Sequence, residues 1–185
     1  LIITEGVEVS HPSSSGYPNV PGFQDKADEG WKKIIEVVQA EGSKIFPQLW
    51  HVGAMRKEGM APDPKVPGYT PSGLVNTNKQ AAHAMTADEV EMLIECFVKD
   101  ILKIKDLGFD GVELHGAHGY LIDNFFWEGT NQRDDSYGGE IDKRTKFACE
   151  IIKRARKEIG RDFPIAIRFS QWKQQDYEAK LAHTP

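Results

Sequence analysis

The sequence predicts an α/β fold, and within that class part of a parallel-stranded TIM (β/α)8 barrel. Short apolar runs alternate with amphipathic helical patterns along the chain, which is typical of a parallel sheet covered by helices. The apolar runs also end in polar residues, and barrels of this kind collect their functional groups at the carboxyl ends of successive strands. An open sheet of the dinucleotide-binding kind would show a Gly-x-Gly-x-x-Gly turn after an early strand. The residues from Thr4 to Val7 do not supply one.

Four buried strands are expected, over residues Leu1–Thr4, Lys44–Trp50, Gly111–His115 and Phe163–Ser170. A complete barrel has eight strands and about 250 residues. The 185 residues are therefore expected to form about half of a barrel, as one partial domain over residues 1–185. The first run reads as a strand cut off at its start, because no initiator methionine precedes it. We therefore expect the chain to be an excerpt of a longer protein.

Three helices are expected between the strands, with apolar stripes over residues 31–38 (Trp31, Ile34, Ile35, Val38), 90–104 and 147–159. The second is delimited most sharply, because Thr86 and Glu89 form a capping box at its start and Gly108 follows its last apolar residue. Two long loops are expected, at Ser10–Gly22 and His51–Met85. Loops of the second length in compact domains are usually lids or binding loops.

The composition is that of an ordinary globular protein, with 39% hydrophobic and 28% charged residues. The 23 basic and 28 acidic residues give a net charge of −5 without a Lys/Arg stripe, so nucleic acid is not an expected partner. The apolar runs are too short for a membrane span. Cys96 and Cys149 both fall at apolar helix positions. This favours two reduced core thiols and a cytoplasmic location over a disulfide or an iron–sulfur cluster.

Two histidines and a tyrosine stand at the exit of the third expected strand. His115 and His118 could bind one carbonyl oxygen or anion through two hydrogen bonds, and Tyr120 could deliver a proton nearby. Two other interpretations stay open at this point. The histidines could be structural residues of a turn, or they could bind zinc with His51 as a third ligand.

Two further polar residues lie in otherwise apolar strands. Gln48 is costly to bury unless it is paired. Its amide offers a donor beside an acceptor, which matches the edge of a pyrimidine-type ring, although a bond to a neighbouring strand is the alternative. Arg168 is expected at the same height on the fourth strand. It could stabilise an anionic ring edge, or it could form a buried ion pair with a carboxylate such as Glu113.

Four motifs taken together resemble the Old Yellow Enzyme family of FMN-dependent ene-reductases. They are residues 48–53 (QLWHVG), 111–121 (GVELHGAHGYL), 131–139 (NQRDDSYGG) and 167–170 (IRFS). The resemblance covers essentially the whole chain, in order and at the family's spacing, so it is far more specific than any one motif. It implies that the four expected strands are the second to the fifth strands of the barrel.

The resemblance implies an oxidoreductase that passes hydride from NADPH or NADH to FMN. The hydride would then pass to the activated C=C bond of an enone, and nitro compounds or quinones would also be accepted. The implied FMN contacts are the backbone at Gly6 and the side chains of Gln48 and Arg168, with no metal ion. The expected partner is thus a small-molecule substrate, and a homo-oligomer is compatible with the sequence.

The same resemblance implies the residues on the substrate side. His115 and His118 would bind the substrate oxygen, and Tyr120 would be the proton donor. Trp50 and Tyr69 would shape the substrate side, although Trp50 could equally be a packing residue. The motif over residues 131–139 is expected to be structural.

The chain departs from the family pattern at two places, both expected to be structural. Ala54 stands where many relatives have Arg, which predicts that a local ion pair is absent. Residues 141–144 (IDKR) replace a common Glu-Asn-Arg motif with Arg144 retained. The larger departure is coverage, because the first and the sixth to eighth strands lie outside the chain. The segment alone is therefore expected to be inactive and to bind FMN weakly or not at all.

Two other functions stay open from the sequence. The first is a metal-dependent barrel hydrolase that uses His115, His118 and His51. The second is a truncated, non-catalytic remnant that survives as a folding or interaction module.

Overall fold

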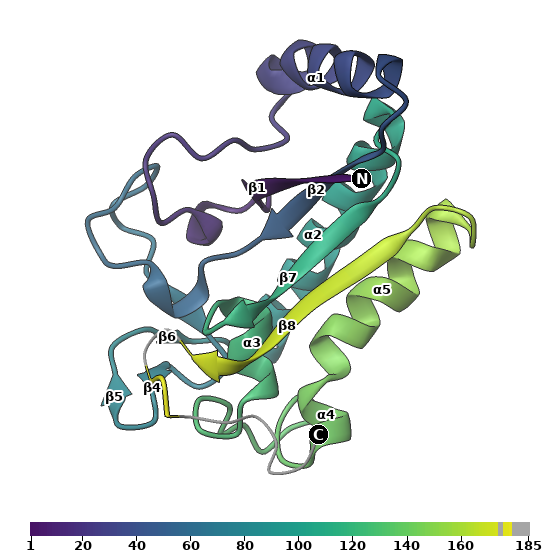
Figure 1. The fold of residues 1–185 in the computed structure, drawn as a ribbon. Helices are drawn as coiled ribbons and strands as arrows, with labels where there is room; N and C mark the ends of the chain where they lie inside the picture. Colours follow the sequence, from purple (N-terminus) through teal and green to yellow (C-terminus); the bar gives the residue numbers. More distant parts are fainter. Residues whose placement is uncertain (174–175, 179–185) are drawn as a thin grey trace.

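A computed structural model describes residues 1–173 and 176–178 of the chain. Its main sheet has four parallel strands: β1 (Ile2–Glu8), β2 (Ile45–Trp50), β7 (Val112–His118) and β8 (Ile165–Lys173). Their order in the sheet, β1-β2-β7-β8, follows their order in the chain. The strands curve without closing into a barrel (Figure 1). This arrangement confirms the predicted half of a (β/α)8 barrel.

The helices lie between the strands in sequence, as the alternating pattern predicts. The three long ones are α1 (Asp28–Ala40), α2 (Ala87–Leu107) and α5 (Lys146–Ile159), and α2 packs against both of the others. Figure 1 shows α2 behind the sheet and α5 along β8. The core forms where their apolar stripes meet the sheet, as with Phe97, Leu114 and Phe147, which are fully buried. Two short helices, α3 (Leu121–Phe126) and α4 (Ile141–Arg144), lie between β7 and α5.

The two ends of helix α2 are set by local interactions that the sequence predicts. The Thr86 side chain accepts a hydrogen bond from the Glu89 backbone N–H, and the Glu89 carboxylate accepts one from the Thr86 N–H, which completes the predicted capping box. At the other end Gly108 has a φ of +98°, a left-handed conformation that costs glycine little. The helix therefore begins and ends where the sequence predicts.

The strands run further than predicted at their carboxyl ends. β1 continues to Glu8, β7 to His118 and β8 to Lys173, beyond the predicted strand ends at Thr4, His115 and Ser170. The reason is that these polar side chains belong to the sheet itself. His115, for example, pairs with Arg168 in the parallel register of β7 and β8. A polar residue in these strands therefore indicates a side chain that faces the barrel interior, and it does not indicate the end of the strand.

The segment between β2 and α2 contains some regular structure that its sequence does not reveal. After the 3-10 turn η3 (Gly53–Met55), two strand pairs form: β3 (Tyr69–Thr70) with β6 (His83–Ala84), and β4 (Leu74–Asn76) with β5 (Lys79–Gln80). Arg56 is 2% exposed and donates to the backbone carbonyls of Ser15, Met60, Ala61, Asp63 and Val66. Arg56 therefore links residues 60–66 of this loop to Ser15, in the loop that follows β1. The other loop contains the 3-10 turn η1 (Pro12–Ser14), and a second 3-10 turn, η2 (Asp25–Ala27), lies directly before α1.

The motif over residues 131–139 forms a hydrogen-bonded turn. Asn131 donates to the carbonyls of Phe125 and Tyr137, and Arg133 forms an ion pair with Asp135. Arg133 also donates to the carbonyls of Pro71 and Met85. The motif therefore joins α3 to the β3–β6 segment.

Two expectations about buried apolar positions are wrong. Cys149 is exposed and not a core thiol, because it lies beside the buried stripe of α5, whereas Cys96 is partly buried and both thiols are free. Ile34, counted in the stripe of α1, is 46% exposed. Other apolar side chains are also exposed, namely Val37 on α1 and, on the edge strand β8, Ile167 and Phe169.

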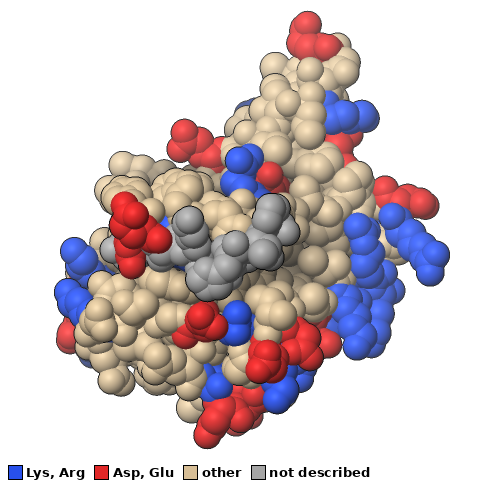
Figure 2. All heavy atoms as spheres, turned by 60° about the horizontal axis from the view of Figure 1, so that its bottom comes forward, with Lys and Arg blue, Asp and Glu red and all other residues tan. Residues whose placement is uncertain are grey.

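Within residues 1–173 and 176–178, no helix combines the length and the apolar character that crossing a membrane requires. The face drawn in Figure 2 carries both acidic and basic side chains.

Candidate active site

All four strands of the main sheet contribute to one cavity of about 330 Å³ near their carboxyl ends. Parallel strands end at the same side of a barrel, so residues far apart in the sequence meet there. The register places Gly6 beside Gln48, Gln48 beside Glu113, and His115 beside Arg168. The cavity is lined by Glu5, Gly6, Gln48, Trp50, His115, His118, Tyr120 and Arg168. It therefore brings together every predicted site residue except Tyr69.

Glu113 joins the two side chains predicted to hold a ring edge. Its carboxylate accepts from Gln48 Nε2 at 2.6 Å and from Arg168 Nε at 2.9 Å. The Glu113 side chain is 7% exposed, whereas that of Arg168 is 47% exposed. Both pairings left open by the sequence are thus present. They also orient Gln48, because an amide nitrogen committed to Glu113 leaves the amide oxygen and the second N–H for another partner.

His115 is buried and neutral. His115 is 6% exposed. Its burial, together with the charge of the neighbouring His118, lowers the pKa of His115 to about 4. A neutral imidazole has one donor and one acceptor nitrogen. Among the described residues, the buried Nδ1 of His115 has no hydrogen-bond partner. A buried polar atom of this kind is unusual in a folded protein and is often completed by a ligand or water.

His118 ends β7 in an uncommon backbone conformation, with a φ of +64°. Its ring centroid lies 5.2 Å from that of His115 and 4.5 Å from that of Trp172, on which it stacks. Partial burial, followed by the positive charges of Arg168 and Lys173, lowers the pKa of His118. Both histidines of the cavity are therefore held toward their neutral form.

Tyr120 completes an aromatic cluster beside the histidines. Its ring centroid lies 5.1 Å from that of His115 and 5.1 Å from that of Trp50. Burial and a hydrogen bond with Tyr17 raise the pKa of Tyr120, so the phenol keeps its proton at neutral pH. Tyr17 also stacks on Trp50. Sequence reasoning missed Tyr17, because it lies in a Ser/Gly/Pro-rich loop where no spacing links it to the strand ends.

Gly6 is required by its neighbour on β2. A Cβ atom built on Gly6 would lie 2.4 Å from Cε3 of Trp50, which no side chain could tolerate without moving the indole. Trp50 is 8% exposed, and within the described part of the chain its buried Nε1 has no partner. The glycine therefore sets the position of the indole on the cavity wall, in addition to any backbone approach to a ligand.

Tyr69 and His51 lie away from this cavity. Tyr69 sits against the rings of His11 and His83. His51 is 1% exposed, and both of its ring nitrogens are used, with Nδ1 accepting from Gly53 N–H and Nε2 bonded to Ser13 Oγ. Burial lowers the pKa of His51 to about 3.

These contacts leave His51 no lone pair for a metal ion. Across residues 1–173 and 176–178, moreover, no group of three His, Cys, Asp or Glu residues is placed to hold one. The metal-dependent hydrolase is therefore not favoured.

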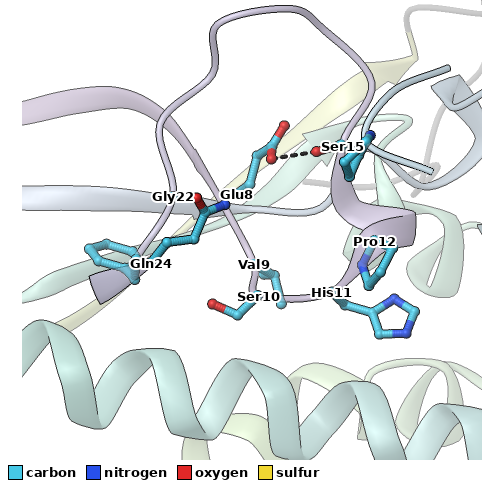
Figure 3. Close-up of a pocket in the computed structure, with 10 residues that line it drawn as sticks. Glu8, Val9, Ser10, His11, Pro12, Ser15, Gly22 and Gln24 are labelled. Carbon is cyan, nitrogen blue, oxygen red and sulfur yellow. Dashed lines mark hydrogen bonds between the residues drawn. The ribbon is translucent and has the colours of Figure 1, made fainter. Parts of the chain in front are cut away.

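A second cavity, of about 260 Å³, lies at the end of β1 and under the following loop. Figure 3 shows the Glu8 carboxylate there, bonded to the Ser15 hydroxyl. Ser10 is bonded to Asp100 in the same way, through its N–H and its hydroxyl. Because these polar groups satisfy each other, this cavity is a weaker candidate than the one at the strand ends.

Comparison with known proteins gives the same fold and names the family. The model of the NADH:flavin oxidoreductase / NADH oxidase family matches residues 1–184. The chain is 38% identical to an NADH oxidase of Thermoanaerobacter brockii, over 92% of this chain and 26% of that protein. It is 36% identical to 12-oxophytodienoate reductase 2 of Arabidopsis thaliana, over 92% of this chain and 48% of that protein.

Solved structures agree with these matches. The crystal structure of Old Yellow Enzyme from Pichia sp. AKU4542 superposes with a TM-score of 0.85 at 31% identity, covering 97% of this chain and 50% of that chain. Morphinone reductase in complex with tetrahydroNAD gives a TM-score of 0.81 at 32% identity, covering 91% and 50%. The chain thus spans at most about half the length of these relatives. It belongs to the NADH:flavin oxidoreductase family, whose structural relatives include Old Yellow Enzyme and whose cofactor is FMN.

Proposed function

We propose that the protein containing this chain is an FMN-dependent oxidoreductase that uses NADPH or NADH to reduce the activated C=C bond of a small enone. Nitro compounds and quinones are further substrates in this proposal. The observation that carries it is the single cavity in which Gln48 and Arg168 face the same space as His115, His118 and Tyr120. The relatives include 12-oxophytodienoate reductases and a morphinone reductase, which are reductases by name.

The residues of the cavity fit a flavin. Within residues 1–173 and 176–178, the bond to Glu113 leaves the amide oxygen and the second N–H of Gln48 available, and together they form the donor–acceptor pair that an imide edge requires. Arg168 places a cation beside it, suited to an electron-rich ring edge, and Glu113 keeps both side chains in place. Gly6, Gln48 and Arg168 are therefore the proposed cofactor contacts. When bound, FMN supplies the hydride chemistry.

His115 and His118 are the proposed contacts for the substrate oxygen. A neutral imidazole can donate one hydrogen bond, and both rings line this cavity near the end of β7, with their centroids 5.2 Å apart. Donors that are already in place stabilise the negative charge that develops on a carbonyl or nitro oxygen during reduction.

Tyr120 is the proposed proton donor to the substrate carbon. Its raised pKa keeps the proton on the phenol until a strongly basic carbon develops nearby. Trp50 forms the adjoining wall and holds the Tyr120 ring edge-on. A substrate-side role for Tyr69 stays a prediction from the family resemblance, as it does not line the cavity.

The test uses the full-length protein. We expect it to be yellow and to bleach with NADPH or NADH. Tyr120→Phe should keep its FMN and lose roughly a hundredfold in kcat/KM for an enone, since a positioned acid typically contributes at least that much. Tyr177→Phe is the matched control, because Tyr177 is 73% exposed and does not line the cavity. A colourless protein, or full activity in Tyr120→Phe, would overturn the proposal.

The cellular location and the assembly of the protein are further proposals. Two free cysteines and no disulfide are compatible with a cytoplasmic protein. Cytoplasmic location, a homo-oligomeric state and the absence of nucleic-acid and membrane partners stay predictions.

A further inference from the structure

His118 is held in a conformation that its own backbone disfavours. A positive φ in a residue other than glycine costs free energy and persists only where the surroundings enforce it. His118 is moreover the only partly buried member of the histidine pair, whereas His115 is enclosed in the sheet. The position of the His118 ring must therefore be set by what packs around it.

The strand β8 departs from regular pairing at this point. Gly116 of β7 pairs with Phe169 and His118 pairs with Lys173, so β8 advances four residues while β7 advances two. Bulges of this kind commonly re-aim side chains beside active sites. The extra residues of β8 are thereby placed around the His118 turn.

Two of these residues contact His118 directly. The Ser170 hydroxyl accepts a hydrogen bond from the His118 N–H at 3.2 Å and donates one to the Trp172 carbonyl at 2.9 Å. The Trp172 ring stacks on the imidazole with an interplanar angle of 25°. Backbone and ring of His118 are thus held from the same segment of β8.

A buried ion pair anchors that segment. Lys173 Nζ lies 2.9 Å from Asp123 Oδ1, and both side chains are 0% exposed. The other oxygen of Asp123 accepts from Gly119 N–H, the residue after His118, at 2.6 Å. A buried ion pair contributes little net stability compared with apolar packing, but it can specify one geometry. Here it joins β8, α3 and the His118 turn.

We propose that the end of β8, residues 170–173, is a clamp that positions His118 for the substrate oxygen, with Lys173 and Asp123 as its anchor and Trp172 as its contact surface. The expected effect of this clamp on catalysis rests on the proposed function. The contacts that hold His118 do not depend on that function. Trp172 and Lys173 are positioning residues, since they act through His118.

The test is made on the full-length flavoprotein with ¹³C-labelled histidine, and His118→Gln identifies the resonances of His118. Trp172→Leu removes the stacked ring, so the His118 ring protons should lose the ring-current shift and move to higher chemical shift. Trp172→Phe should largely restore the original position, because a stacked ring is retained. Lys173→Met should broaden or multiply the same resonances. Lys153→Met is the matched control, since it removes a lysine from an exposed pair with Glu150 on α5.

The catalytic arm is measured separately. Trp172→Leu should lower kcat/KM for an enone about tenfold with FMN content unchanged, because small displacements of a positioned group reduce rate steeply. If Lys173→Met does not fold, Trp172→Leu and Ser170→Ala still test the clamp. Unchanged His118 resonances in folded Trp172→Leu and Ser170→Ala would overturn it. A shift of these resonances in a protein that reduces no enone would support the clamp and overturn the proposed function instead.

Discussion

His51 and His115 are both neutral through burial, with pKa values lowered to about 3 and about 4. An unfolded histidine titrates near 6.5. Between these values the unfolded chain binds more protons than the folded one, so acid favours unfolding. Their contribution is complete above about pH 6.5 and is lost as the pH falls to about 4 for His115 and about 3 for His51.

We therefore expect the free energy of unfolding to decrease when the pH is lowered from 7 to 5. His51→Gln should be less stable at pH 7 by roughly 1–3 kcal/mol, because hydrogen bonds to Gly53 and Ser13 are disturbed. It should also show a smaller loss between the two pH values, since one titrating group is gone. Urea unfolding at both pH values measures this, and an equal pH dependence in the variant would contradict it.

Glu113 is the residue of the site that sequence analysis identified only as a partner. Its single carboxylate compensates Arg168 and orients Gln48. Replacing it by Gln removes a buried negative charge next to the proposed flavin site. Reduction of a flavin adds negative charge, so Glu113→Gln should raise the flavin midpoint potential by roughly 30 mV, equivalent to about 1.4 kcal/mol for two electrons.

A redox titration of the full-length protein measures this shift. Glu5→Gln is the matched control, because Glu5 lines the same cavity but is exposed and therefore better screened. The charge argument for Glu113 fails if both variants shift the potential equally.

Helix α2 begins at a capping interaction between two of its own residues, Thr86 and Glu89. Thr86→Ala removes the hydrogen bond to the Glu89 N–H and should cost about 1 kcal/mol of stability. Urea unfolding compares it with Thr77→Ala, an exposed threonine in the β4–β5 turn. A loss in the control as large as in Thr86→Ala would show that the cap is not responsible.

Local chemistry explains which elements the sequence predicts well. The limits of α2 follow from side chains that bond to their own backbone, and the strands follow from apolar runs. The ends of β7 and β8 do not follow, because a polar residue inside a barrel strand resembles one in a loop. The bulge that brings Trp172 to His118 depends on the register between β7 and β8. The sequence of one strand alone does not predict that register.

The candidate site, like the fold, includes residues that the sequence predicts and residues that only the tertiary structure brings there. Family-level motifs place Gln48, His115 and Arg168 at strand ends, and the sheet register then brings them together. Tyr17 and Trp172 reach the cluster through loop and bulge geometry. No periodic pattern in the sequence points to either residue.

For the molecule as a whole, the four strands form an open sheet with β1 and β8 at its edges. In barrels of this class the loops after the seventh and eighth strands commonly bind the phosphate group. We therefore expect residues 1–185 expressed alone to bind FMN weakly or not at all, and the full-length protein to bind it tightly. Titration followed by flavin fluorescence measures both. Tight binding by the isolated segment would contradict the expectation.

The order of the sheet also has a consequence for the order of folding. Within the main sheet, β2, β7 and β8 each pair with the main-sheet strand that precedes them in the chain, so this sheet can grow as the chain leaves the ribosome. β8 is the last strand to be added, and it brings both Arg168 and the segment that holds His118. The histidine turn would therefore acquire its fixed shape only when the fourth strand docks, which places the assembly of the cavity at the end of folding for this part of the protein.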